Sequence, residues 1–390
     1  MGRYELATKA LVLSLVLGAV AGTRPGELVR KVPAMYVFGD STLDVGNNNY
    51  LQGEGVPRAN RPFYGIDLPG SGKPTGRFSN GYNTADFEYN FVKINCVYIC
   101  ILMHAAQSLG FHKSPLAYLV LKAHDKLIPS AKSRGVSYAS AGSGILDSTH
   151  AGNNIPLSQQ VRLFESTKAE MKAKMGPNAV SYLISKSFFL LGAGSNDLFV
   201  FATSMAKQNK TATQSDVTAF YGSLLSNYSA TIAELYKLGA RKVAIVNVGP
   251  VGCVPGVRVL DPTGACSDGL NKLAAGFDAA LKSLLAELAP KLPGMAYSIA
   301  DSFGLTQAAL ANPVALGFSS SDSACCGSGR LGAQGDCTPA ATLCPDRDSF
   351  VFWDSVHPSQ KSAMIAVKAY FDGPTQYTTP ITFKQLATAS

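Results

Sequence analysis

The chain has 390 residues, of which 46% are hydrophobic and 15% are charged. This composition excludes an intrinsically disordered protein, and the length suffices for one large α/β domain. The formal net charge of +8 bears first on solubility and on nonspecific attraction to acidic surfaces. Because no basic stripe interleaved with aromatic residues accompanies this charge, we expect no nucleic-acid partner.

The N-terminal segment has the layout of a secretory signal peptide over residues 1–22. A basic start precedes an apolar run at residues 10–20, and the small-x-small sequence AVA stands at residues 19–21. This run is about half of the roughly 20 residues that a spanning helix needs, so we expect cleavage and no stable membrane span. Export would leave the sequons at Asn209 and Asn227 open to glycosylation and the cysteines open to oxidation.

Short apolar runs and helical patterns alternate along the chain and predict its fold class. The predicted strands lie at residues 33–38, 135–138, 188–191, 242–248 and 295–299. The clearest helical patterns lie at residues 156–175, 216–238 and 268–288. This alternation indicates an α/β domain with three layers, α/β/α, around a central five-stranded parallel sheet. We expect the domain to cover residues 32–375 and to be followed by a tail at 376–390.

Polar residues follow the predicted strands at places where ligands bind in parallel sheets. Ser41 comes directly after the first strand, a glycine-rich stretch at 139–144 after the second, and Asn196 after the third. The carboxyl ends of parallel strands share one edge of the sheet, so these residues can converge there. A dinucleotide site at the glycines before Asn196 is disfavoured, because Asp197 stands where a third glycine would be needed.

Near the C-terminus, Asp354 and His357 lie in a loop before a helix that we expect to begin near Pro358, since proline suits the first helical position. A serine hydroxyl becomes a nucleophile when a positioned base removes its proton and a third group orients that base. Each of these signals is weak alone, because such residues more often form turns and caps. Together, Ser41, His357 and Asp354 supply the set for a serine hydrolase, and Asn196 could stabilise an oxyanion.

Six cysteines fall in the C-terminal half, at positions 253, 266, 325, 326, 337 and 344. Cys253 and Cys266 bracket a loop rich in proline and glycine and could pair with each other, while the remaining pairings stay open. No Cys-x-x-Cys or histidine set has the spacing of a zinc site, so we expect no metal and no cofactor.

Five motifs occur together in this chain: FGDSTLDVGNNN (38–49), PTGRFSNG (74–81), YASAGSGI (138–145), GSND (194–197) and DSVHP (354–358). In this combination the chain resembles the plant-type GDSL esterase/lipase family, a branch of the SGNH hydrolases, from about residue 32 to residue 373. Thr42 stands where the family name has leucine, a variation with little expected effect.

The resemblance implies a flavodoxin-like arrangement of the sheet and a role for each motif residue. Ser41 would be the nucleophile, His357 the base and then the acid, and Asp354 the group that orients His357. The oxyanion would be bound by the backbone N–H of Ser41, by the side-chain amide of Asn196 and by a backbone N–H of the glycine-rich block, for which Gly144 is preferred and Gly142 is the alternative.

The resemblance also implies a secreted, monomeric esterase or lipase of the cell wall or apoplast that acts on small-molecule, lipid or acylated-sugar esters. Two alternatives stay open. One is an acyltransferase that uses the same acyl-enzyme, and the other is a secreted wall or defence protein with impaired turnover.

One segment departs from the family pattern. Residues 88–104, which include Cys96 and Cys100, interrupt a stretch that usually continues as one helix. We interpret this segment as an insertion from translated intron or a gene-model error, a hypothesis that transcript sequencing across the segment would test.

Overall fold

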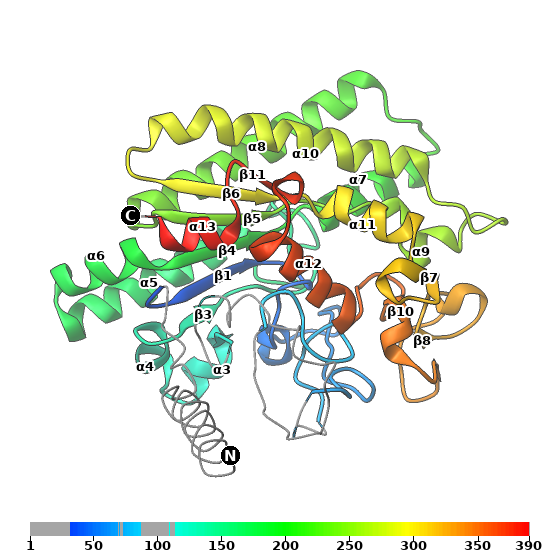
Figure 1. Cartoon of the computed structure of the whole chain (residues 1–390), viewed down its shortest axis with the longest axis horizontal. Helices are drawn as coiled ribbons and strands as arrows, with labels where there is room; N and C mark the ends of the chain where they lie inside the picture. The colour runs from blue at the N-terminus through cyan, green and yellow to red at the C-terminus, as the bar shows by residue number, and fades with distance from the viewer. Residues whose placement is uncertain (1–31, 69, 71–72, 87–108, 110–113, 390) are drawn as a thin grey trace, which may run out of the picture. The chain divides into compact units, whose positions relative to one another are not determined.

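A seven-stranded sheet forms the centre of the domain (Figure 1). The computed structural model describes residues 32–68, 70, 73–86, 109 and 114–389. The predicted signal peptide and the insertion at residues 88–104, with its two cysteines, lie outside these residues.

All five predicted strands are present and lie side by side in parallel, and the predicted α/β class is confirmed. They are β1 (Met35–Gly39), β3 (Gly135–Ser137), β4 (Phe188–Gly192), β5 (Lys242–Val246) and β6 (Ala296–Ala300). Their spatial order, β3-β1-β4-β5-β6, is the flavodoxin-like order 2-1-3-4-5. The order reverses at β1, so β1 lies at the switch point where ligands bind in such sheets.

Two short strands at the edges of the sheet were not predicted. β2 (Leu116–Ala117) pairs in parallel with β3, and β11 (Thr378–Thr379) pairs antiparallel with β6. A strand of two residues has no apolar run or alternation that a sequence pattern could show. The strand β11 and helix α13 (Phe383–Thr388) also correct the prediction of a tail at 376–390, because this segment packs on the sheet and its Phe383 is buried.

Alternating side chains of β1 divide the core between the two faces of the sheet. Tyr36 and Phe38 belong to a large core on one face, whereas Met35 and Val37 belong to the core on the other face. The first core packs against α3 (Tyr118–Ala123), α4 (Leu127–Ala131), α5 (Leu157–Met175), α6 (Pro177–Lys186), α7 (Ser195–Lys207), α8 (Gln214–Lys237) and α10 (Asp268–Leu288). The second packs against α11 (Ser302–Ala311), α12 (Gln360–Asp372) and α13, and Figure 1 shows α12 and α13 in front of the sheet.

The three predicted helices correspond to α5, α8 and α10, with ends within two residues of the expected ones. The helix expected to begin near Pro358 begins at Gln360 instead. Ser359 caps it, because its side chain accepts the Ser362 N–H. A serine hydroxyl can satisfy a free N–H of the first turn, which proline cannot do.

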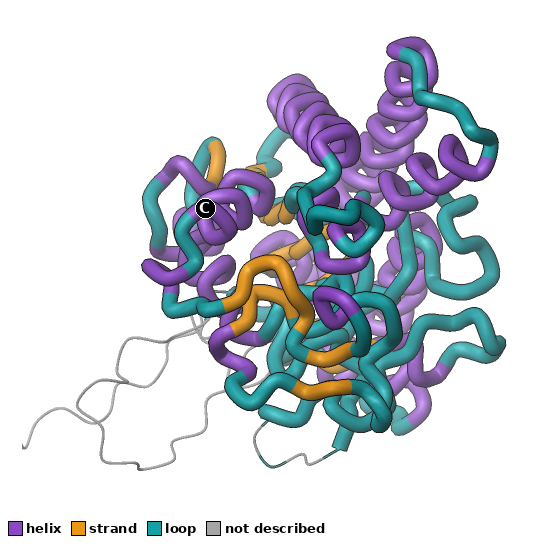
Figure 2. The backbone as a smooth tube through the Cα atoms, turned by 90° about the vertical axis from the view of Figure 1, so that its right-hand side faces the viewer, coloured by secondary structure: helices purple, strands orange, loops and turns teal. Residues whose placement is uncertain are grey.

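A smaller region lies beside the carboxyl ends of the strands and contains the strand pairs β7–β10 and β8–β9. Its elements are β7 (Ser320–Ala324), β8 (Cys326–Gly327), β9 (Thr342–Leu343), β10 (Phe350–Phe352) and the short helix α9 (Pro255–Arg258). The expected pair Cys253–Cys266 is present, together with Cys325–Cys344 and Cys326–Cys337. In Figure 2, which faces this region, its short strands are seen to be joined by loops.

Within the described part of the chain, no helix is both long and apolar enough to cross a membrane.

Candidate active site

The turn after β1 brings Ser41 to the carboxyl edge of the sheet. Gly39 ends the strand with a φ of +149°, and a Cβ at this position would lie 2.1 Å from the carbonyl oxygen of Gly192 in β4. The side-chain amide of Gln160 on α5 accepts the Gly39 N–H at 2.8 Å and donates to the Gly39 carbonyl at 2.9 Å. The strand end is therefore fixed on both sides, and the chain turns sharply into Ser41.

Asp40 supports this turn. Its carboxylate accepts the Thr42 N–H at 2.9 Å and the Thr42 hydroxyl at 2.8 Å. Burial raises the pKa of Asp40 above its usual value, although both bonds from Thr42 act in the opposite direction. These contacts make Asp40 a support of the loop that carries Ser41.

Ser41, His357 and Asp354 form one continuous chain of hydrogen bonds. His357 Nε2 lies 2.8 Å from Ser41 Oγ, and His357 Nδ1 lies 2.8 Å from both carboxylate oxygens of Asp354. The Asp354 carboxylate also accepts the backbone N–H groups of Val356 and His357, at 2.9 and 2.8 Å. The turn over the two intervening residues thus brings the carboxylate to the ring nitrogen that faces away from Ser41.

Asp354 stays ionised although it is buried. Burial alone would raise its pKa, but the charge of His357 and the hydrogen bonds from His357 and Val356 outweigh burial and lower the pKa. A charged carboxylate at this position stabilises a protonated imidazole, as a base in this arrangement requires.

Two aromatic side chains that sequence reasoning missed lie beside Asp354 and His357. The Tyr64 hydroxyl donates to Asp354 Oδ2 at 2.8 Å, and the Tyr64 ring packs edge-on against Trp353 with centroids 6.3 Å apart. The Phe78 ring lies 4.8 Å from the His357 ring. The sequence signal that could have pointed to Phe78 is the PTGRFSNG motif, to which Phe78 belongs. No feature of the sequence links Tyr64 to Asp354, which lies 290 positions away.

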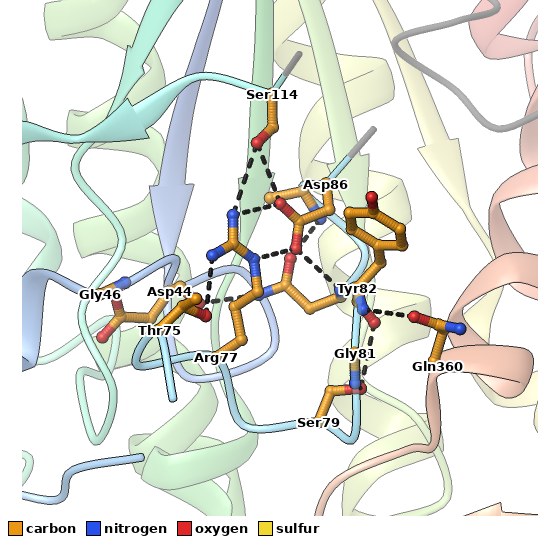
Figure 3. Close-up of polar contacts among 12 residues, drawn as sticks. Asp44, Gly46, Thr75, Arg77, Ser79, Gly81, Tyr82, Asp86, Ser114 and Gln360 are labelled. Atoms are coloured by element: carbon orange, nitrogen blue, oxygen red, sulfur yellow. Dashed lines mark hydrogen bonds and ion pairs between the residues drawn. The ribbon is translucent and has the colours of Figure 1, made fainter. Parts of the chain in front are cut away.

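A buried ion pair holds the loop that carries these aromatic residues (Figure 3). Nε and Nη2 of Arg77 donate to the two carboxylate oxygens of Asp86, and both side chains are buried. The Ser114 hydroxyl donates to Asp86 at 3.0 Å. The Tyr82 N–H donates to the Gln360 side chain at 2.8 Å, which ties the loop to the first residue of α12.

The loop after β3 is held by a carboxylate from α7. Asp197 accepts the N–H groups of Ile145 and Leu146, at 2.8 and 3.0 Å, and the Thr149 hydroxyl at 2.7 Å. Burial raises the pKa of Asp197, and these three bonds counteract the effect. Both carboxylate oxygens of Asp197 are therefore engaged in positioning this loop.

Asn196 and the glycine-rich block meet beside Ser41. Asn196 Nδ2 donates to the Ser143 carbonyl at 2.9 Å, which leaves its second amide hydrogen for another acceptor. Within the described residues, no acceptor is bound to the backbone N–H groups of Ser41, Gly142 and Gly144. Gly142 is partly exposed, whereas Gly144 is buried.

A cavity of about 180 Å³ opens at Ser41, Asn196 and His357. Its other walls are largely apolar and come from the ends of β4 and β5 and from helices α11 and α12. In the described residues, no group of three or more His, Cys, Asp or Glu side chains could hold a metal ion.

The chain is similar to known proteins over most of its length. The model of the family described as GDSL-like lipase/acylhydrolase matches residues 35–369. A GDSL esterase/lipase of Arabidopsis thaliana is 34% identical over 391 residues, which cover 98% of this chain and 97% of the relative. A second one from the same plant is 36% identical over 362 residues, which cover 91% of this chain and 90% of the relative. The match to a solved phospholipase A1 from Streptomyces albidoflavus covers 86% of this chain and 96% of that protein, at 14% identity and a TM-score of 0.32.

Proposed function

This chain belongs to the GDSL-like lipase/acylhydrolase family and is a plant hydrolase that acts on ester bonds, and we propose that it works through an acyl-enzyme on Ser41. The observation that carries the proposal is the unbroken chain of hydrogen bonds from Ser41 through His357 to Asp354, at the mouth of an apolar cavity. In the proposed reaction, His357 takes the Ser41 proton as Oγ attacks the ester carbonyl, and then protonates the departing alcohol. Water activated by His357 releases the acid in the second step.

The proposed oxyanion donors are the Ser41 N–H, the Asn196 side chain and one backbone N–H of the glycine-rich block. For this last donor, the motif alone led us to prefer Gly144. The contacts in the structure favour Gly142 instead. In a trans peptide the N–H points opposite to the C=O. The Ser143 carbonyl and the Gly144 N–H belong to the same peptide. Because this carbonyl is directed at the Asn196 amide, the Gly144 N–H is directed away from Asn196.

The surroundings of the two glycines support the same choice. An ideal Cβ on Gly144 would lie 2.4 Å from Asp197 Oδ1, so glycine is needed there for close packing. Gly142 is partly exposed and has a φ of +82°, and within the described residues no acceptor is bound to its N–H. We therefore assign the second backbone donor to Gly142.

We further propose that the protein is secreted to the cell wall or apoplast. Three disulfides support this proposal, because such bonds persist in oxidising compartments. Asn209 and Asn227, the two glycosylation acceptors, are both exposed. Mass spectrometry of apoplastic fluid should detect the chain without residues 1–22 and with glycan on these asparagines, whereas an intact N-terminus inside the cell would contradict the proposal.

The catalytic proposal is tested with a fluorophosphonate probe and a short-chain ester. The wild-type protein should be labelled on Ser41 and should release acid, and Ser41→Ala should lose both properties while its thermal melting stays unchanged. A Ser41→Ala protein with full activity would refute the assignment. Incubation with a glyceride and an acceptor alcohol separates hydrolysis from the alternative acyl transfer, because only the transferase yields a new ester. Failure of the wild-type protein to react with the probe would favour the impaired wall protein instead.

A further inference from the structure

Three consecutive carbonyl groups of the loop after β3, at residues 141–143, each accept a hydrogen bond from an asparagine side chain. The three asparagines come from different places in the chain: the segment after Ser41, the segment just before α5, and the first turn of α7. The peptides on both sides of Gly142 are among those held in this way. The three bonds run from Asn48 Nδ2 to Ala141 at 2.9 Å, from Asn154 Nδ2 to Gly142 at 3.1 Å and from Asn196 Nδ2 to Ser143 at 2.9 Å.

The surroundings of the Asn48 amide permit only one orientation. Its Nδ2 donates to the carbonyls of Ala141 and Pro57, at 2.9 and 3.0 Å, and its Oδ1 accepts the Ser140 hydroxyl at 2.5 Å. A flipped amide would place Oδ1 against two carbonyl oxygens, which have no hydrogen to donate. Because Asn48 is buried, leaving any of these groups unpaired would be unfavourable.

The segment that follows Ser41 also holds the N–H of Ala141. Asp44 Oδ2 accepts this N–H at 3.1 Å, and Asn48 binds the carbonyl of the same residue. Both backbone groups of Ala141 are thus bonded to side chains that lie shortly after Ser41 in the chain. The loop that contains Gly142 is therefore attached directly to the segment that contains Ser41.

The direction of the Gly142 N–H follows from the bond that Asn48 makes. In a trans peptide the N–H points opposite to the C=O. The Ala141 carbonyl points at Asn48, so the Gly142 N–H of the same peptide points away from Asn48. The Gly142 carbonyl lies 3.0 Å from His150 Nδ1 and accepts the Asn154 amide as well. Side chains therefore fix both peptides of a glycine, the residue whose backbone is otherwise the least restricted.

We propose that Asn48 and Asn154 are positioning residues, which fix the two peptides of Gly142 and so hold its N–H where the negative charge of the transition state develops. The inference rests on the proposed acyl-enzyme at Ser41 and on the choice of Gly142 as the second backbone donor. A donor that is already aligned stabilises the transition state because it need not reorient as the charge develops. Both asparagines act through the backbone of Gly142 and not by contact with the substrate.

The test compares ester hydrolysis with binding of a transition-state analogue, both measured on the full-length protein. The analogue is an aryl trifluoromethyl ketone: Ser41 Oγ adds to its carbonyl carbon, the Ser41 proton passes to His357, and the former carbonyl oxygen takes the negative charge. Asn48→Ala should lower kcat for p-nitrophenyl butyrate by about 10- to 100-fold with KM unchanged. The inhibition constant of the ketone should rise by the same factor, because binding of the adduct and turnover depend on the same donors.

Asn47→Ala is the matched control for Asn48→Ala. Both asparagines lie in the same short helical turn, both are buried, and within the described residues each side chain makes three hydrogen bonds. The bonds of Asn47 go to the backbone of Ser137, Ala139 and Leu119. Both variants should lower the melting temperature by similar amounts. Asn47→Ala should nevertheless keep kcat within about twofold of wild type, since the peptides of Gly142 keep their bonds.

Asn154→Ala tests the second peptide. Asn154 is only partly buried, so this variant should fold even if Asn48→Ala does not. It should lower kcat by about three- to tenfold with KM unchanged and weaken binding of the ketone equally.

Two results would overturn the inference while leaving the proposed function intact. In the first, the wild-type protein hydrolyses the ester, yet folded Asn48→Ala or Asn154→Ala keeps the wild-type kcat. In the second, Asn47→Ala lowers kcat as much as Asn48→Ala does, which would make Asn48 a general support of the fold. If the wild-type protein hydrolyses no ester and Ser41 is not labelled by the fluorophosphonate, the proposed function itself is wrong and the positioning role is lost with it.

Discussion

One buried carboxyl group on α10 should make the stability of the protein fall as the pH rises. The Asp278 side chain accepts the Val248 N–H through Oδ1 at 3.0 Å, whereas Oδ2 has no hydrogen-bond partner in the described part of the chain. Burial raises the pKa of Asp278 from 3.8 to about 8, the Val248 N–H counteracts part of this effect, and the nearby Asp301 adds to it. At neutral pH the group is therefore mostly protonated in the folded protein.

The sign and size of the effect follow from the two pKa values. In the unfolded chain Asp278 ionises near pH 3.8, whereas in the folded protein it keeps its proton to about pH 8. Its contribution to stability is therefore complete below pH 3.8 and is lost as the pH rises through about 8. One pKa unit corresponds to about 1.4 kcal/mol, so the loss between about pH 4 and pH 8 is on the order of 5 kcal/mol.

Asp278→Asn removes this ionisation and keeps an acceptor for the Val248 N–H. The free energy of unfolding in urea should be measured for both proteins at several pH values from 4 to 9. The variant should gain stability relative to the wild type as the pH rises, by several kcal/mol over the range. Glu287→Gln, on the exposed side of the same helix, should show no such gain. A difference between wild type and Asp278→Asn that stays constant across the pH range would refute the reasoning.

Three further substitutions test the site and its support. Tyr64→Phe keeps the ring and removes the hydrogen bond to Asp354, which should lower kcat about tenfold with KM unchanged, since bonds to charged groups contribute about 1.5–3 kcal/mol; an unchanged kcat would contradict a positioning role. Asn196→Ala should lower kcat by about 100- to 1000-fold in an ester assay while circular dichroism shows a folded protein, and activity near wild type would remove Asn196 from the oxyanion site. Arg77→Met leaves Asp86 buried without its cation and should lower the free energy of unfolding by about 3–5 kcal/mol in urea titrations, whereas an unchanged midpoint would mean that the pair adds nothing.

The central strands could be predicted because both faces of the sheet are covered. A parallel strand buried on both sides has a continuous apolar run, as residues 188–191 do, and that pattern is visible without knowledge of any partner. The polar residues directly after such runs then fall at one sheet edge, which brought Ser41 and Asn196 to the same loop cluster.

The parts that sequence reasoning missed depend on contacts between distant segments. The tail predicted at 376–390 contains Phe383, but a single buried aromatic residue near a chain end gives no periodic signal, and its partners Phe188 and Phe371 lie on other elements. The proposed choice of Gly142 over Gly144 depends on the direction of one carbonyl group. A motif specifies residue types and spacing, and it does not specify the orientation of a peptide plane.

The position of Asp354 links the proposed secretion to the proposed chemistry. Cys325 and Cys326, which belong to separate disulfides, donate their backbone N–H groups to the carbonyls of Phe352 and Trp353, at 3.1 and 2.8 Å. These two carbonyls belong to the residues directly before Asp354, so the disulfide-linked segment fixes the backbone from which the carboxylate reaches His357. Ser41 is fixed separately, by its position at the end of β1. The proposed chemistry therefore requires two segments to be held at the right distance from each other. The disulfides that hold the segment before Asp354 form in an oxidising compartment.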